Sequence, residues 1–149
     1  MLILLILQNL LCKTSYLWGG VEYPPHTKTS IICKTETLDS YISRIKVNKL
    51  DFIKCDVEGA ELLCFKGGIN TIKQYKPIIC TEMLRKWAAK FNYHPNNIIV
   101  LLKDIGYSCF KLINATKIEE IFLITNETKD TNFIFLHKNK HKKHIENLI

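Results

Sequence analysis

The stretch Leu50-Asp-Phe-Ile-Lys-Cys-Asp-Val-Glu-Gly-Ala-Glu61 decides the fold of this chain. Residues 50–55 form an apolar run that predicts a buried strand, and Gly59 marks a turn before a helix that begins at Ala60. The carboxylates Asp56 and Glu58 therefore follow the strand directly. Because ligands bind at the carboxyl ends of strands in open α/β sheets, the stretch predicts a functional edge at Asp56.

The neighbouring segments extend this stretch into a strand–helix–strand unit. Helical periodicity covers 60–66 and 69–75, with an interruption at Gly67 and Gly68, and we expect Gly67 to end the first helix. A second strand follows at 77–82. Since such a crossover joins parallel strands, Asp56 and Glu82 are expected at the same edge of the sheet.

Periodicity and turn residues predict the remaining elements of a single α/β domain. The predicted elements are strands at 30–35, 107–113 and 132–137, and helices at 38–47 and 96–106. Thr37 or Asp39 is expected to cap the helix that begins at residue 38. We expect polar connections at 83–95 and between the last two strands, where 118–124 has enough apolar residues for additional structure.

The composition is that of a globular domain, with 149 residues of which 47% are hydrophobic. No segment approaches the roughly 20 apolar residues that cross a bilayer. The opening MLILLILQNLLC fits a core strand, a helix, a misplaced start codon or a signal peptide without a basic flank or cleavage site. We favour a cytoplasmic location and expect no membrane binding.

The net charge of +7 is partly concentrated in the tail 137–149, which holds four Lys and one Glu. We interpret this tail as a solvated, frayed terminus. Nucleic-acid binding is the alternative, but the tail lacks aromatic residues for stacking on bases, so we do not expect it. The six cysteines show no C-x-x-C spacing, which favours reduced thiols and predicts no metal site.

Each candidate site residue also has a purely structural interpretation. Asp56 is either a cleft-facing general base or the partner of Lys54 in an ion pair. Glu82 either joins Asp56 in accepting a proton or binding a divalent cation, or it forms a salt bridge with Arg85 or Lys86. Glu61 fits a helix N-terminus, where a carboxylate is favoured by the helix dipole. His94 is more typical of a surface loop than of catalysis.

The motifs around these residues resemble the FkbM family of methyltransferases. The matching segments, in order, are Thr37-Leu-Asp-Ser-Tyr41, Asp51-Phe-Ile-Lys-Cys-Asp-Val-Glu-Gly-Ala-Glu61, Phe65-Lys-Gly-Gly68 and Pro77-Ile-Ile-Cys-Thr-Glu82. Asn132-Phe-Ile-Phe-Leu-His137 resembles the last strand of that family. Cys55 replaces a usual aliphatic residue and Phe65 a usual Leu, and neither change removes a functional group.

The resemblance implies a Rossmann-like class I methyltransferase fold with a mostly parallel sheet and an antiparallel last strand. It implies S-adenosylmethionine as methyl donor and O-methylation of a hydroxyl on a sugar or small metabolite. Asp56-Val-Glu-Gly59 would end the fourth strand beside the site of transfer. Asp56 then becomes the first catalytic candidate, Glu58 the second and Glu82 the third.

The chain departs from the family at the cofactor side, because it contains no G-x-G turn and 36 residues leave no room for about three strands expected before Thr37. We therefore expect a fold truncated at its N-terminus. We divide the chain into a possible remnant of the cofactor half at 1–36, the carboxyl-terminal half of the methyltransferase domain at 37–138, and a basic tail at 139–149. A second chain supplying the missing half is one expectation, and an inactive, partner-binding remnant is the alternative.

Overall fold

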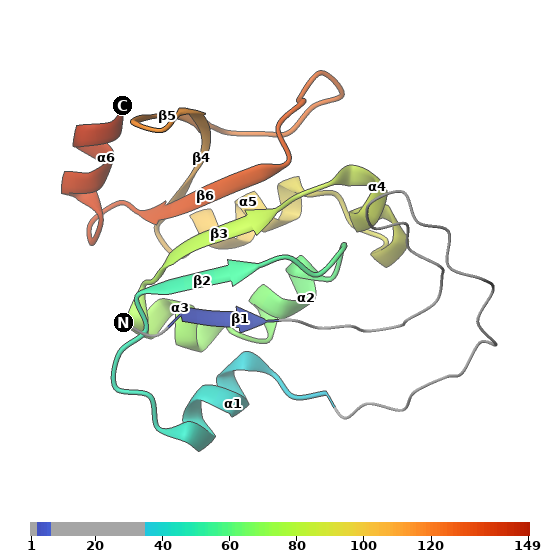
Figure 1. The fold of residues 1–149 in the computed structure, drawn as a ribbon. Coiled ribbons are helices and arrows are strands. Elements are labelled where there is room, and N and C mark those ends of the chain that lie inside the picture. Colours follow the sequence, from blue (N-terminus) through green and yellow to red (C-terminus); the bar gives the residue numbers. More distant parts are fainter. Residues whose placement is uncertain (1–2, 7–34) are drawn as a thin grey trace, which may run out of the picture.

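The fold is an α/β arrangement around one sheet, seen in a computed structural model that describes residues 3–6 and 35–149 (Figure 1). The sheet has six strands in the order β1-β2-β3-β6-β4-β5. Their bounds are β1 Ile3–Ile6, β2 Phe52–Cys55, β3 Ile78–Glu82, β4 Tyr107–Asn114, β5 Lys117–Ile121 and β6 Asn132–His137. The apolar N-terminal segment thus contributes a strand beside β2.

The pairing of the strands corrects the expected mostly parallel sheet. β1, β2 and β3 pair in parallel, as the crossover from β2 to β3 predicts. The other three pairings, β3 with β6, β6 with β4 and β4 with β5, are antiparallel. The segment expected as a polar connection contains β5, and only two residues separate β5 from β4. So short a connection can join only antiparallel strands.

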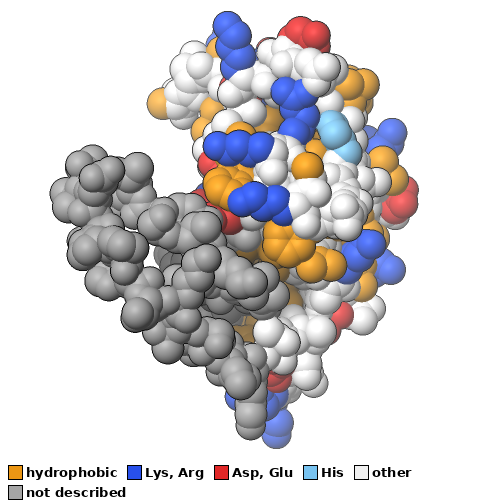
Figure 2. Space-filling model, turned by 90° about the vertical axis from the view of Figure 1, so that its right-hand side faces the viewer, with side chains coloured by type: hydrophobic (Ala, Val, Ile, Leu, Met, Phe, Trp, Pro, Cys, Tyr) orange, Lys and Arg blue, Asp and Glu red, His pale blue; other side chains and the backbone are white. Residues whose placement is uncertain are grey.

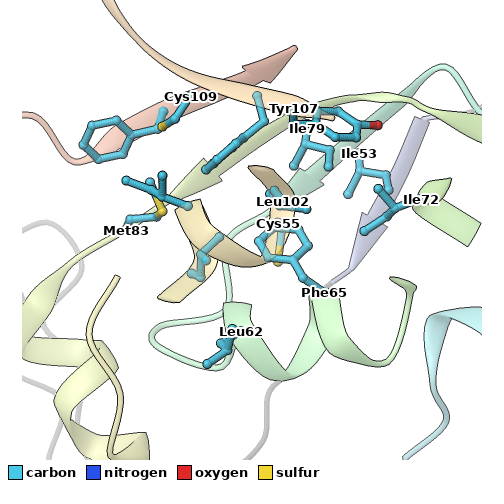
Figure 3. Close-up of a cluster of buried hydrophobic side chains, with 14 of the residues drawn as sticks. Ile53, Cys55, Leu62, Phe65, Ile72, Ile79, Met83, Leu102, Tyr107 and Cys109 are labelled. Atoms are coloured by element: carbon cyan, nitrogen blue, oxygen red, sulfur yellow. The ribbon is translucent and has the colours of Figure 1, made fainter. Parts of the chain in front are cut away.

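The helices of the described residues cover both faces of the sheet. Their bounds are α1 Leu38–Ile45, α2 Glu61–Lys66, α3 Ile69–Tyr75, α4 Arg85–Ala88 followed by a 3₁₀ turn at Ala89–Phe91, α5 Asn96–Lys103 and α6 Lys142–Leu148. Apolar residues of α1, α2, α3 and α5 share one buried cluster with alternate residues of the strands. Figure 3 shows Leu62, Phe65, Ile72 and Leu102 in this layer beneath the sheet residues.

The predicted N-terminal cap of α1 is present, and a residue of α1 also caps the neighbouring helix α3. Thr37 Oγ1 accepts the N–H of Ser40 at 3.2 Å. Asp39, the other candidate, instead accepts the N–H groups of Asn70 at 3.2 Å and Thr71 at 2.7 Å, which begin α3. One carboxylate of α1 thereby satisfies the free amides at the start of a second helix.

One local prediction is wrong, one holds in part and one is not tested. Gly67 ends α2 as expected, but as a C-cap whose φ of −73° and ψ of −7° continue the helical backbone toward α3. The connection at 83–95 contains α4 and the 3₁₀ turn, whose short length leaves no apolar period to recognise. The strand predicted at 30–35 falls almost entirely outside the described residues.

The basic tail is not frayed but forms α6. Ile145 and Leu148 of α6 pack against Phe110, Ile118 and Leu136, a small cluster on the face opposite to α2 and α5. The sequence prediction missed this helix because its two packed apolar residues, Ile145 and Leu148, lie among lysines. Throughout the described ranges, no helix has both the length and the apolar character that crossing a membrane requires.

Two buried histidines hold the turn between β6 and α6. His141 Nδ1 accepts the N–H of His137 at 2.9 Å, and His137 Nδ1 accepts the N–H groups of Asn139 and Lys140, both at 3.3 Å. Protonation of either Nδ1 would turn this acceptor into a donor, which would then face a backbone N–H donor instead of accepting from it. Burial, reinforced by Lys140 and His144, lowers the pKa of His141 to about 4, and burial also lowers the pKa of His137.

These contacts predict that the free energy of unfolding falls as the pH drops from about 6.5 toward 4. The folded-state pKa of each histidine lies below its unfolded value, so the unfolded chain takes up more protons over this range. The variant His141→Asn, whose Oδ1 can replace Nδ1 as acceptor, should flatten this dependence by roughly 1 kcal/mol between pH 7 and 5. Urea unfolding at several pH values measures it.

The matched control is Lys143→Gln, because Lys143 is exposed on α6 and is not among the groups that shift the pKa of His141. It should keep the pH dependence of the wild type. An equally steep dependence in His141→Asn would contradict the role of His141.

Candidate active site

The carboxyl ends of β2 and β3 lie side by side and carry the two main candidate carboxylates. Cys55 of β2 is in register with Thr81 of β3 in the parallel pair. Asp56 and Glu82 are the next residues along the two strands. The structure therefore places them as neighbours at one edge of the sheet.

Asp56 combines both interpretations that its sequence position allows. Its Oδ2 lies 3.3 Å from Nζ of Lys54, so the ion pair is formed. The Asp56 side chain nevertheless keeps 48% of its surface exposed. A half-exposed ion pair contributes little to stability, but it orients the carboxylate at the edge, where an approaching molecule can reach it.

Glu82 is less exposed than Asp56 and has no cation within salt-bridge distance among the described residues. Burial raises the pKa of Glu82, and the negative charge of Asp56 raises it further, only partly opposed by Lys54. The predicted alternative of a salt bridge to Arg85 or Lys86 is not formed.

The two cations have other partners. Arg85 donates from Nη1 to the side-chain oxygen of Asn126 and from Nη2 to its backbone oxygen. Lys86 and Lys90 lie over the ring of Trp87, at 5.1 and 3.7 Å from its centroid. Figure 2 shows the side of the molecule toward which β2 and β3 point, where Lys and Arg side chains lie among hydrophobic ones.

The turn after Asp56 has an unusual backbone. Glu58 and Gly59 both have positive φ, 51° and 106°. A non-glycine residue rarely adopts this conformation, so it must be held in place by its surroundings. Glu58 itself stays exposed and, apart from a small contribution to the raised pKa of Glu82, the described contacts do not bring it to the other carboxylates.

Glu61 is the group that holds the turn. Its side chain is buried, with Oε1 accepting the N–H groups of Val57 and Gly59, both at 3.1 Å. The other oxygen, Oε2, accepts the hydroxyl of Tyr93 at 3.1 Å. Burial and the charge of Glu61 raise the pKa of Tyr93, which keeps the hydroxyl protonated as a donor.

Sequence reasoning placed Glu61 at a helix N-terminus, which is correct, but missed its contacts with the turn. The signal was present, because Glu61 lies inside the apolar run Ala60-Glu-Leu-Leu63. A charge in such a run is costly unless it is hydrogen-bonded. Glu61 therefore positions the motif, although its own carboxylate does not reach the edge of the sheet where Asp56 and Glu82 lie.

His94 makes none of the described contacts of the candidate carboxylates. It is exposed in the loop before α5, where its Nδ1 accepts the N–H of Asn96 at 3.2 Å and its N–H donates to Asn97 Oδ1 at 3.0 Å. These bonds cap the start of α5. The surface-loop interpretation of His94 is confirmed.

A hollow of about 370 Å³ lies between α1 and α3. Its lining includes Asp39, Lys46, Thr71 and Tyr75 but none of the carboxylates at the ends of β2 and β3. Asp39, one of its lining residues, already serves as the cap of α3.

The geometry agrees with a comparison to known families. A model described as Methyltransferase FkbM domain matches residues 6–109. This chain belongs to the FkbM methyltransferase family. The resemblance to this family is confirmed, and the match extends from the end of β1 through the motif at Asp56 into β4. The segment Asn132–His137, which also resembles the family, lies beyond the matched residues. No curated protein and no solved structure shows a significant match to this FkbM chain.

The described residues of the FkbM chain contain no G-x-G turn of the kind that binds S-adenosylmethionine. A glycine-rich turn after a first strand would let backbone amides approach the ligand, and the residues after β1 fall outside the described ranges. Gly59 does not serve this purpose, because its α-carbon faces the backbone oxygen of Trp87. The described residues also hold no group of three or more His, Cys, Asp or Glu suited to a metal.

The contacts of Glu61 predict how its replacement affects folding. Glu61→Ala leaves the N–H groups of Val57 and Gly59 unbonded and should lower the free energy of unfolding by about 2–3 kcal/mol. Glu61→Gln keeps one oxygen for these amides and should cost roughly 1 kcal/mol. Urea unfolding measures both, and equal losses for the two variants would contradict the assigned hydrogen bonds.

Gly59 gives a second prediction about the same turn. A Cβ at residue 59 would lie 2.4 Å from the backbone oxygen of Trp87, at a φ that side chains avoid. Gly59→Ala should therefore cost about 2–4 kcal/mol in thermal or urea unfolding. The control is Gly67→Ala, where φ is helical and the nearest atoms lie at 3.4 Å, so it should fold as stably as the wild type or better.

Proposed function

We propose that this FkbM chain takes part in S-adenosylmethionine-dependent O-methylation of a hydroxyl on a sugar or small metabolite. The observation that carries the proposal is the pair Asp56 and Glu82 at the adjoining carboxyl ends of two parallel strands. Membership of a methyltransferase family supports the reaction class. The strand order β1-β2-β3-β6-β4 supports our further proposal of a Rossmann-like class I sheet.

The chain's own residues supply the acceptor side of the reaction in this proposal. Asp56, oriented by Lys54, accepts the hydrogen bond of the acceptor hydroxyl and takes its proton as the oxygen is methylated. Glu82, whose pKa is raised, is a second proton acceptor beside it. Glu58 remains the second candidate in the motif, on the exposed side of the turn. The cofactor, when bound, supplies the methyl group.

The proposal predicts that Asp56→Asn lowers methyl transfer by a factor of about 10²–10⁴ while S-adenosylmethionine binding is unchanged. The measurement is transfer of labelled methyl groups by the full chain to a panel of sugars and small alcohols, with binding followed by thermal stabilisation. Glu82→Gln should reduce transfer less. A larger loss in Glu82→Gln would assign the proton transfer to Glu82.

Asp51→Asn is the matched control. Asp51 lies at the other end of the same strand and pairs with Lys49 at 3.1 Å, so its replacement should leave transfer intact. Full turnover in Asp56→Asn would exclude a catalytic role for Asp56.

The second candidate function is a non-catalytic, partner-binding module. It is favoured by the exposed apolar side chains Leu112, Ile113, Phe122 and Leu123 at the ends of β4 and β5. If the full chain neither binds S-adenosylmethionine nor transfers methyl groups, this candidate or an active assembly with a second chain supplying the cofactor half replaces the first. Restored transfer on adding such a chain would distinguish the assembly from the non-catalytic module.

A further inference from the structure

The strand β5 forms one outer edge of the described sheet. In the strand order it follows β4 and has no further neighbour (Figure 1). On its inner side it pairs antiparallel with β4, with Ile118 opposite Leu112 and Glu119 opposite Lys111. The backbone N–H and C=O groups on its outer side therefore have no strand to pair with among the described residues. An edge of this kind is a template for a strand of another chain.

The charges of β5 select one way in which this edge can pair with a second copy of itself. Because side chains alternate along a strand, two antiparallel copies related by a two-fold axis perpendicular to the sheet place one residue opposite its own equivalent. With Ile118 at the axis, Lys117 of each copy lies opposite Glu119 of the other, which gives two pairs of opposite charge. An axis at Lys117, Glu119 or Glu120 opposes two like charges, which destabilises a sheet, and an axis at Ile121 gives no charge pair.

Both charged side chains are available for this pairing. Lys117 is exposed and forms no ion pair with any described residue. The Glu119 side chain is 56% exposed, and its Oε2 lies 3.3 Å from Nζ of Lys111 on the neighbouring strand. Since a carboxylate has two acceptor oxygens, Glu119 can keep Lys111 and also contact Lys117 of a second copy.

Exposed apolar side chains at the two ends of β5 fit the same arrangement. Phe122 and Leu123, which follow β5, are 71% and 55% exposed. Leu112 and Ile113, which precede the turn into β5, are each 52% exposed. In an antiparallel pair the end of one β5 lies beside the start of the other, so Phe122 of one copy approaches the turn after Ile113 of the second copy. Pairing thereby removes apolar surface from water at both ends of the strand.

We propose that two copies of this chain associate through β5, with the two-fold axis at Ile118, and join their six-stranded sheets into one continuous sheet. Main-chain hydrogen bonds, the two pairs of Lys117 with Glu119 and the apolar ends of the strands hold the dimer. The candidate carboxylates Asp56 and Glu82 stay away from this interface, because β6 and β4 separate β2 and β3 from β5. The association is therefore independent of methyl transfer.

The first test is sedimentation equilibrium of the full chain over micromolar to millimolar concentrations. Because the interface is small, we expect a weak and reversible dimer, whose average mass rises with concentration from that of one chain toward twice that value. A chain that stays monomeric at all concentrations would overturn the proposal and leave the edge to a different protein. Growth beyond the dimer would also overturn it, because a two-fold interface closes at two copies.

Charge reversal then tests the register. Lys117→Glu opposes Glu to Glu at both pairs and Glu119→Lys opposes Lys to Lys, so each variant alone should dimerise roughly tenfold to hundredfold more weakly than the wild type. An equimolar mixture of the two variants restores both pairs of opposite charge and should recover the dimer. The matched control is Lys73→Glu, an exposed lysine on α3, which should dimerise as the wild type does. A dimer insensitive to Lys117→Glu, or a mixture no tighter than the single variants, would overturn the proposed pairing.

Amide hydrogen exchange and an apolar variant provide an independent check. The N–H groups on the outer side of β5 should exchange with solvent severalfold more slowly as the concentration of the chain rises, because they become hydrogen-bonded to the second copy. Phe122→Ser should weaken the dimer severalfold while the single chain stays folded, because this side chain is largely exposed. Concentration-dependent protection of a different element, with β5 unchanged, would contradict the proposal. None of these readouts depends on methyl transfer, so failure of the proposed function leaves the test intact.

Discussion

The candidate site depends on the hydrogen bonds that the buried carboxylate of Glu61 accepts. It accepts two backbone N–H groups of a turn whose residues 58 and 59 both have positive φ. Without an acceptor these amides would be left unpaired in a buried environment, which costs more than an average hydrogen bond gains. Glu suits this position because both oxygens of a carboxylate are acceptors. One accepts the two amides and the other accepts the Tyr93 hydroxyl.

The same turn is fixed from its other side by close packing. Gly59 lies so near the backbone oxygen of Trp87 that no side chain fits. The short helix α4 is thereby pressed against the motif, and Trp87 brings Lys86 and Lys90 to the same region. The conformation of Asp56 and Glu58 is thus set by contacts from α2 and from the α4 region, although neither helix contributes a carboxylate to the edge.

The sequence predicted the elements whose pattern is local. β6 and α3 have the predicted bounds, and β2, β3 and α5 lie within theirs, because each is a clear run or face of apolar residues. α4 is only four residues long, and β5, Lys117-Ile-Glu-Glu-Ile121, contains three charges. Each is stabilised by its neighbours in space, which no single window of sequence reveals. The helix α6 was not predicted for the same reason, since its two packed apolar residues lie among lysines.

The candidate site was predictable in part for the same reason. Parallel crossover alone implies that Asp56 and Glu82 share an edge, and the register of β2 with β3 places them there. The ion pair of Asp56 with Lys54 was one of the predicted alternatives, but the partner of Arg85 was not predictable. Lys54, two residues before Asp56, extends along the strand to pair with it, whereas Arg85 turns away to Asn126 and leaves Glu82 without a cation among the described contacts. The environments of Asp56 and Glu82 therefore differ because Arg85, at the start of α4, points toward Asn126. A salt bridge to Glu82 would have lowered the pKa of Glu82, which burial and the charge of Asp56 now raise.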